Sequence, residues 1–215
     1  MPTGQFITFE GGEGTGKSTQ AQHLARRLNK KGIHVMVTRE PGGSQRAEQI
    51  REVLLNGVDE KLGPLAEALL FSAARDDHMT KIIRPALRAG SWIICDRFTD
   101  STRVYQGVGG GVSEEVLESL EDLVVGNVRP QLTIILDIPA EQGLARAKAR
   151  RSEGEAADRF EVMDVNFHNT LRSAFLNIAD KEPDRCIVVD ASGTEAHVAD
   201  QIWSIVKKKF ELNME

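Results

Sequence analysis

The residue types that can hold a phosphate group are concentrated near the amino end of the chain, in residues 11–19. Gly11 opens the pattern G-x-x-x-x-G-K-[ST], which Gly16, Lys17 and Ser18 close. Glycines let a loop curl so that successive backbone N–H groups point at phosphate oxygens. A lysine at this position meets the β- and γ-phosphates, and the hydroxyl that follows it holds Mg²⁺. The loop therefore predicts a nucleoside triphosphate site that uses magnesium.

Such a loop needs a strand before it and a helix after it. Residues 5–10 mix apolar and β-branched side chains as a buried strand does, and residues 17–31 carry apolar residues at helical spacing. This setting disfavours the alternative, a glycine-rich turn with a merely solvated lysine. The residues expected to contact the triphosphate are Gly11, Gly12, Glu13, Gly14, Thr15, Gly16, Lys17, Ser18 and Thr19.

Arginines from four further segments could bind a second phosphate, because a guanidinium group pairs with phosphate oxygens bidentately. Each arginine taken alone could equally be solvated. Together, opposite a triphosphate site, they indicate a second phosphate-bearing substrate and hence phosphoryl transfer between nucleotides. The four are Arg39, Arg51, Arg75 and Arg97.

Two carboxylates compete for the role of metal ligand. The apolar run 91–95 ends in Asp96, and the run 132–136 ends in Asp137. A carboxylate at the end of a strand beside the loop can bind Mg²⁺, usually through water. Asp96 is favoured because the basic Arg97 follows it; its alternative is a structural carboxylate that caps the next turn.

Side chains that could recognise a base and a sugar follow in two places. A long helical stretch is expected from 65 to about 89, with an apolar stripe made of Leu69, Leu70, Ala73 and Ala74. Phe71 and Arg75 are four residues apart on it, so they share one face. The alternative reading makes Phe71 a core residue and Arg75 solvent-facing. Residues 98–107 hold several hydrogen-bonding side chains, although by composition they are an ordinary polar loop or short helix, and the glycines of residues 107–111 predict a flexible break after them. These side chains are Ser101, Thr102, Tyr105 and Gln106.

A polar segment at about residues 146–160 could close over the triphosphate. A basic helix is expected over 141–151, followed by small and acidic residues at 152–157 and by the start of another helix at 158–159. Residues 160–180 are expected to form an amphipathic helix with Phe160 on its buried face. Arginines here could stabilise charge on the transferred phosphoryl group. A surface helix with solvated charges is the alternative. The candidates are Arg146, Arg150, Arg151 and Arg159.

The elements that must position these residues follow an alternating order. Strand-like runs separated by helical patterns predict an α/β fold, with a parallel sheet covered by helices on both faces and one domain over residues 1–215. The expected strands are residues 5–10, 33–38, 91–95, 132–138 and 186–190.

Composition narrows the class of protein. The chain has 40% hydrophobic and 27% charged residues, and its net charge of −5 argues against a nucleic-acid or membrane surface. Cys95 and Cys186 lie in apolar runs and are expected to be buried, reduced thiols. No signal peptide or long apolar span is recognised, so the expected location is cytoplasmic.

Several of these motifs together make the sequence resemble the bacterial thymidylate kinases over essentially the whole chain. The resemblance implies a P-loop fold with a five-stranded parallel sheet, a homodimer, and transfer of the γ-phosphoryl of ATP to dTMP to give dTDP and ADP. Another nucleoside monophosphate kinase, or a P-loop ATPase switch, is the alternative. The motifs are Phe9 to Ser18, Thr38 to Gly43, Asp96 to Phe98, Tyr105 to Gly107, Arg129 to Thr133 and Asp158 to Glu161.

The resemblance also implies a role for individual residues. Glu13 matches a carboxylate that meets the deoxyribose 3′-hydroxyl, and Tyr105 matches a side chain that excludes a 2′-hydroxyl. Phe71 matches an aromatic ring that stacks on thymine. The acceptor phosphate is assigned to Arg39 and Arg97, with Arg51 in the same pocket. The base edge is assigned to Arg75, Thr102 and Gln106.

The catalytic charge is the one point where members of that family differ. Some carry an arginine inside the phosphate loop, whereas positions 12 to 15 here are Gly, Glu, Gly and Thr. The resemblance then moves this charge to the segment over the triphosphate. The implied catalytic set is Lys17, Arg97, Arg150 and Arg159, with Arg146 on ATP and with Ser18 and Asp96 on Mg²⁺.

Overall fold

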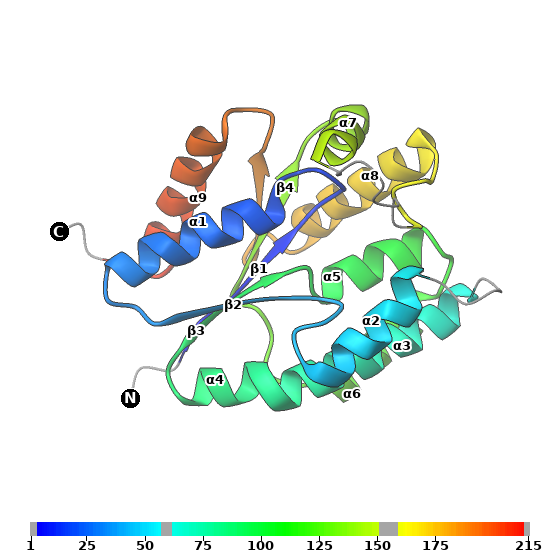
Figure 1. Cartoon of the computed structure of the whole chain (residues 1–215), viewed down its shortest axis with the longest axis horizontal. Helices are drawn as coiled ribbons and strands as arrows, with labels where there is room; N and C mark the ends of the chain where they lie inside the picture. The colour runs from blue at the N-terminus through cyan, green and yellow to red at the C-terminus, as the bar shows by residue number, and fades with distance from the viewer. Residues whose placement is uncertain (1–3, 57–61, 151–158, 213–215) are drawn as a thin grey trace.

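The computed structural model of the chain describes residues 4–56, 62–150 and 159–212. In this part of the chain five parallel strands form one sheet in the order β2-β3-β1-β4-β5 (Figure 1). The predicted α/β fold with a five-stranded parallel sheet is confirmed, and strand bounds move by one or two residues. The strands are β1 (Phe6–Glu10), β2 (Val35–Arg39), β3 (Trp92–Asp96), β4 (Leu132–Asp137) and β5 (Cys186–Asp190).

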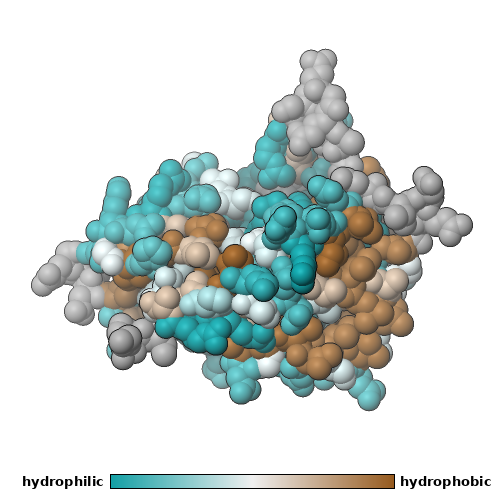
Figure 2. Space-filling view, turned by 60° about the horizontal axis from the view of Figure 1, so that its bottom comes forward, coloured by the Kyte–Doolittle hydropathy of each residue, from teal (hydrophilic) through white to brown (hydrophobic). Residues whose placement is uncertain are grey.

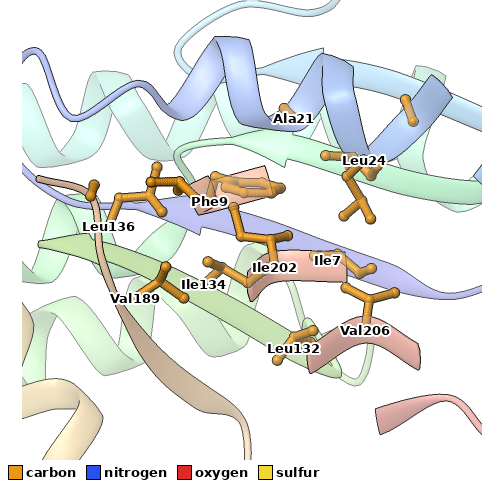
Figure 3. Close-up of a cluster of buried hydrophobic side chains, with 14 of the residues drawn as sticks. Ile7, Phe9, Ala21, Leu24, Leu132, Ile134, Leu136, Val189, Ile202 and Val206 are labelled. Atoms are coloured by element: carbon orange, nitrogen blue, oxygen red, sulfur yellow. The ribbon is translucent and has the colours of Figure 1, made fainter. Parts of the chain in front are cut away.

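One face of the sheet is covered by α1 (Lys17–Lys30) and α9 (Glu195–Lys209), which lie side by side in Figure 1. The apolar side chains of the two helices interdigitate with alternate residues of β1, β4 and β5, as Figure 3 shows around Ile134 and Ile202. Alternate strand residues point to opposite faces, so the other half of each strand must be buried by a second layer. Both faces of the sheet are therefore closed, as its apolar strands require.

The second face carries two smaller apolar clusters. The first joins β1 and β3 to η1 (Met79–Ile83), α4 (Arg84–Arg88) and α6 (Glu114–Val124). The second joins β4 and β5 to α8 (Val165–Lys181) and to η2 (Arg103–Val108), a π-helical segment. The remaining helices are α2 (Gln45–Asn56), α3 (Pro64–His78), α5 (Thr99–Thr102) and α7 (Ala140–Arg150).

The long helix predicted from residue 65 to about 89 is divided into α3, η1 and α4. Pro85 has no N–H for a continuous α-helix, and the wide π-turn lies directly before it. The apolar stripe predicted for this helix is partly wrong. Ala74 is buried, but Leu69 is 50% exposed and Ala73 is also exposed, because the helix turns Ala68 and Arg75 inward instead.

Two predicted helix starts are also wrong. Phe160 lies in a turn, and α8 begins only at Val165, where the Asp164 side chain accepts a hydrogen bond from the Phe167 N–H. This N-cap fixes the start of the helix. Arg159 likewise lies in a turn, while Asp158 and Arg151 fall outside the described residues. Residues 107–111, predicted as a flexible break, continue η2 to Val108 and end in a turn.

Cys95 and Cys186 are buried and unpaired, as predicted. Among the described residues, no helix combines the length and apolarity that crossing a membrane would require.

Candidate active site

The ends of β1 and β3 bring the phosphate loop and the residues that follow Asp96 together. The strands are parallel, and Phe9 pairs with Asp96, so the loop after β1 and the residues after β3 leave the same edge of the sheet. Arg97 N–H donates to the Phe9 carbonyl at 2.9 Å, which extends this pairing by one residue. The phosphate loop and Arg97 are therefore neighbours because of the sheet.

The phosphate loop is curled and packed against α7. Gly14 has a φ of +66°, and a Cβ there would lie 1.9 Å from the Gly143 carbonyl oxygen, so only glycine fits. Inside the curl, Lys17 Nζ donates to the carbonyls of Gly12 at 2.6 Å and Gly11 at 3.2 Å. Burial and the nearby Arg97 cation lower the pKa of Lys17 to about 8. The loop thus holds a desolvated cation at its centre.

The two candidate metal carboxylates have different partners. Ser18 Oγ donates a hydrogen bond to Asp96 Oδ2 at the start of α1. Asp137 instead receives two hydrogen bonds from Arg172, at 2.7 and 2.8 Å. A hydroxyl and a carboxylate are oxygen donors of the kind that Mg²⁺ prefers, so Ser18 and Asp96 fit that ion. Asp137 is already neutralised by an arginine.

At the border of the loop, Glu13 and Arg97 form a partly buried ion pair. Arg97 Nη2 donates to Glu13 Oε1 at 2.6 Å, and the Tyr105 hydroxyl donates to the same oxygen at 2.8 Å. Burial raises the pKa of Glu13, but Arg97 and Lys17 outweigh it and bring this pKa down to about 2. Arg97 has a φ of +67°, a strained region for a side chain of this size. This backbone turn directs the guanidinium back over the loop, where Nη1 reaches the Gly11 carbonyl.

Next to this ion pair lies a cavity. It gathers most of the residues predicted to bind an acceptor nucleotide. An aromatic wall beside charged and amide groups suits a base with its sugar phosphate. The cavity is lined by Glu13, Glu40, Pro41, Leu55, Phe71, Arg75, Arg97, Phe98, Ser101, Thr102, Tyr105, Gln106 and Phe160.

The other two predicted acceptor arginines lie beside the cavity rather than in its wall. Arg39 is half-exposed and pairs with Glu48 at 2.9 Å. Arg51 Nη1 donates to the carbonyl of Pro41, which itself lines the cavity, at 2.7 Å. Arg51 therefore contacts a residue of the cavity wall without lining the cavity itself, and Arg39 pairs with a residue that does not line the cavity.

Arg75 is buried, so the solvent-facing alternative for it is wrong. Its Nε donates to Glu40 at 2.7 Å, and its Nη2 donates to Thr102 Oγ1 at 2.9 Å. Glu40 also meets His78 Nδ1 at 3.0 Å, and His78 Nε2 meets Thr38. Sequence reasoning missed Glu40 and His78, because nothing in a strand end or a helix shows that the two will meet.

The arginines near residues 146–160 lie in two places. Arg146 donates to the carbonyls of Ala191 and Ser192, beyond β5. Arg159 Nη1 donates to Glu67 Oε1 at 2.7 Å, on the side of the acceptor cavity. Arg150 ends α7, and residues 151–158, most of the predicted closing segment, fall outside the described residues.

Glu10, at the end of β1, is a further carboxyl group that sequence reasoning missed. It is fully buried, with Oε1 accepting from the N–H groups of Phe98 and Ser101 and Oε2 accepting from Ser101 Oγ. Burial, helped by the negative charge of Asp100, raises the pKa of Glu10 from 4.5 to about 8. Near neutral pH the group is therefore largely protonated in the folded chain.

This pKa predicts a pH-dependent effect of Glu10→Gln. The folded chain keeps the Glu10 proton up to about pH 8, whereas the unfolded chain loses it near pH 4.5. The contribution of this residue to stability therefore decreases as the pH rises from about 4.5 to about 8. An amide cannot ionise; its oxygen can accept from the two N–H groups, and its NH₂ group can donate to Ser101 Oγ. We expect the melting temperature of the variant to rise relative to that of the wild type between pH 6 and pH 9, by on the order of 5 °C.

Thermal unfolding of the wild type and the variant from pH 6 to pH 9 checks this prediction. Glu118→Gln, on the exposed side of α6, controls for the loss of one negative charge. A Glu10→Gln difference that stays constant across the series would contradict the prediction.

The sequence of this chain is similar to those of known thymidylate kinases. Residues 9–202 match the family model described as thymidylate kinase. The chain is 52% identical over 206 residues to a thymidylate kinase of Bradyrhizobium sp. (strain ORS 278), covering 96% of this chain and 91% of the relative. It is 54% identical over 205 residues to a thymidylate kinase of Rhodopseudomonas palustris (strain ATCC BAA-98 / CGA009), covering 95% and 89%.

Solved structures agree. The crystal structure of thymidylate kinase from Ehrlichia chaffeensis matches with a TM-score of 0.76 at 35% identity, covering 95% of this chain and 99% of that one. The family match spans the phosphate loop, Arg97 and the cavity residues alike. The chain belongs to the thymidylate kinase family.

Proposed function

We propose that this chain transfers the γ-phosphoryl group of ATP to dTMP, giving dTDP and ADP. The observation that carries the proposal is the common border of two sites. Arg97 donates both to the phosphate loop, at the Gly11 carbonyl, and to Glu13 in the wall of the acceptor cavity. Two phosphate groups bound on either side of Arg97 would be close enough for direct transfer.

On the donor side, the loop N–H groups and Lys17 hold the triphosphate of ATP. Lys17 is already inside the curl and exchanges its carbonyl partners for phosphate oxygens. Ser18 and Asp96 are the residues that would hold Mg²⁺, which neutralises phosphate charge when bound. Arg146, on α7 and bonded to the loop after β5, contributes to the ATP side, and Arg150 and Arg159 are the candidates for further catalytic charge.

On the acceptor side, the cavity takes the nucleoside part of dTMP. Phe71 offers a ring for stacking, and Arg75, Thr102 and Gln106 offer polar groups for the base edge. Glu13 is ionised and accepts hydrogen bonds, which suits the 3′-hydroxyl of a deoxyribose. Tyr105, held on Glu13 and against Phe160, limits the space beside the sugar.

The reaction depends on aligning the two substrates more than on a general base that removes a proton. A phosphate monoester is already a nucleophile, so the chain has to bring it in line with the γ-phosphoryl group and neutralise the charge between them. Arg97 can do both, since its guanidinium stays charged at every working pH. Arg39 and Arg51 add positive charge near the same phosphate.

The exposed apolar side chains of α3 and α6 support a homodimer. Leu65 and Leu69 on α3 and Val116 and Leu123 on α6 are between 39% and 82% exposed, and the two helices pack against each other. Figure 2 shows a broad hydrophobic area on the side of the molecule that carries these helices. We propose that a second copy of the chain covers this area, since such patches mark protein interfaces.

We also propose the cytoplasm as the location of the enzyme. ATP and dTMP are metabolites of that compartment, and both cysteines are free thiols.

A panel of acceptors tests the proposed function. We expect the purified chain with ATP and Mg²⁺ to release ADP rapidly with dTMP and far more slowly with dAMP, dGMP or dCMP. Lys17→Ala should abolish this turnover while the melting temperature stays close to the wild-type value. An ADP release that is indifferent to every monophosphate would make the chain an ATPase switch, and a preference for another monophosphate would make it a different kinase.

The position of Arg97 predicts a selective defect in Arg97→Ala. The variant loses charge-assisted hydrogen bonds to the acceptor phosphate, so the Kd of dTMP should rise roughly 10- to 100-fold, while the Kd of ATP changes little. Isothermal titration calorimetry measures both constants. Arg129→Ala, an arginine that pairs with Glu121 and Asp122 on α6, is the matched control. Equal losses for both ligands would show that the acceptor site is misplaced.

The dimer proposal predicts that Leu69→Glu separates the copies. A buried charge at the centre of an apolar interface is unfavourable by several kcal/mol. Light scattering after gel filtration should give twice the chain mass for the wild type and a single chain mass for the variant. Val188→Glu, at an exposed position on β5, should leave the mass unchanged. A monomeric wild type would overturn the proposal.

A further inference from the structure

Glu67, on α3, is a buried carboxylate shared by two residues of the site. Its Oε2 accepts from Gln106 Nε2 at 3.1 Å, and its Oε1 accepts from Arg159 Nη1 at 2.7 Å. Glu67 is only 9% exposed. It connects an amide in the wall of the acceptor cavity with an arginine next to the segment predicted to close the site.

The arginine is fixed independently of this contact. Its guanidinium carbon lies 4.4 Å from the centre of the Phe160 ring, and Phe160 packs edge-on against Tyr105 at 5.0 Å. Arg159 and Glu67 form a salt bridge of 2.7 Å. Arg159 therefore holds the Glu67 carboxylate in place.

An ionised carboxylate accepts hydrogen bonds and cannot donate them. The amide of Gln106 must therefore turn its NH₂ group towards Glu67, whichever way the amide is drawn. Gln106 is 1% exposed, and its backbone is held in η2, where its carbonyl accepts from the Val112 N–H at 3.0 Å. The side-chain carbonyl oxygen is the end of the amide that is left for a ligand in the cavity.

We propose that Glu67, held by Arg159, is a positioning residue that sets base specificity, by fixing Gln106 with its side-chain carbonyl oxygen towards the acceptor base. This inference rests on the proposed function of the cavity as the dTMP site. A carbonyl oxygen in this position accepts from the ring N3–H of thymine or uracil. Cytosine has a lone pair at N3 instead of an N–H group. Its N3 and the Gln106 carbonyl oxygen are then both acceptors, and no hydrogen bond forms between them.

The neutral variant Glu67→Gln tests the proposal. The amide introduced by this substitution can accept from or donate to the Gln106 amide, so Gln106 can turn its NH₂ group to the cavity. The ratio of kcat/KM for dTMP to that for dCMP should fall on the order of 10-fold, the cost of one mismatched buried hydrogen bond. The ratio for dTMP to dUMP should stay within about twofold, because both bases present the same N3–H.

The chain offers a matched control in Glu121→Gln on the neighbouring helix α6. The Glu121 side chain is 13% exposed, against 12% for Glu67, and it also pairs with an arginine, Arg129. This variant should keep both ratios at the wild-type values. A general effect of removing the charge of a largely buried carboxylate would appear in both variants.

Equilibrium binding of dTMP and dCMP without ATP gives a second readout. If Glu67→Gln folds poorly, Arg159→Met should lower the dTMP-to-dCMP ratio in the same direction, since Glu67 loses its positive partner. An unchanged dTMP-to-dCMP ratio in a folded variant, with or without a loss of overall rate, overturns the proposal. A wild type that binds dTMP but phosphorylates no pyrimidine monophosphate refutes the proposed function instead, and the binding ratio still decides the role of Glu67.

Discussion

The ion pair between Glu13 and Arg97 is the contact on which the site depends. It joins the loop after β1 to the turn after β3 at 2.6 Å, and it stands between the phosphate loop and the acceptor cavity. A lone charge at this depth would be costly, so each member stabilises the ionised form of the other. Glu13 consequently keeps a low pKa, and Arg97 contacts the phosphate loop and lines the cavity at the same time.

The sheet order makes this pair possible. β1 lies between β3 and β4, and all three strands end at the same edge, so short segments after them converge without long loops. The buried carboxylates add a second layer of support. Glu10 holds the turn that carries Arg97 and Ser101, Glu40 holds Arg75, and Glu67 holds Gln106. Three polar side chains that line the cavity, Ser101, Arg75 and Gln106, thus donate hydrogen bonds to a buried carboxylate.

Much of this arrangement could be predicted from the sequence, for physical reasons. The phosphate loop is local, because backbone curvature and a following helix are encoded in adjacent residues, and buried parallel strands read as apolar runs. The supporting carboxylates are not local. Glu67 on α3 and Gln106 on η2 are separated by η1, α4, β3 and α5, and a glutamate on a helix looks solvated until its partner is known. The apolar stripe of α3 predicts a core face, but part of it is exposed, because an apolar stripe suits an interface as well as a core.

Other errors have equally specific causes. Phe160 was assigned to α8 because it is apolar, whereas Asp164 caps the helix later and lets Phe160 pack on Tyr105. The most direct test of the account is a crystal structure of the chain with ADP and dTMP bound together. The account predicts the thymine ring against Phe71 and the dTMP phosphate on Arg97, facing the terminal phosphate of the loop-bound nucleotide. A dTMP molecule bound away from Arg97 and Phe71 would contradict it.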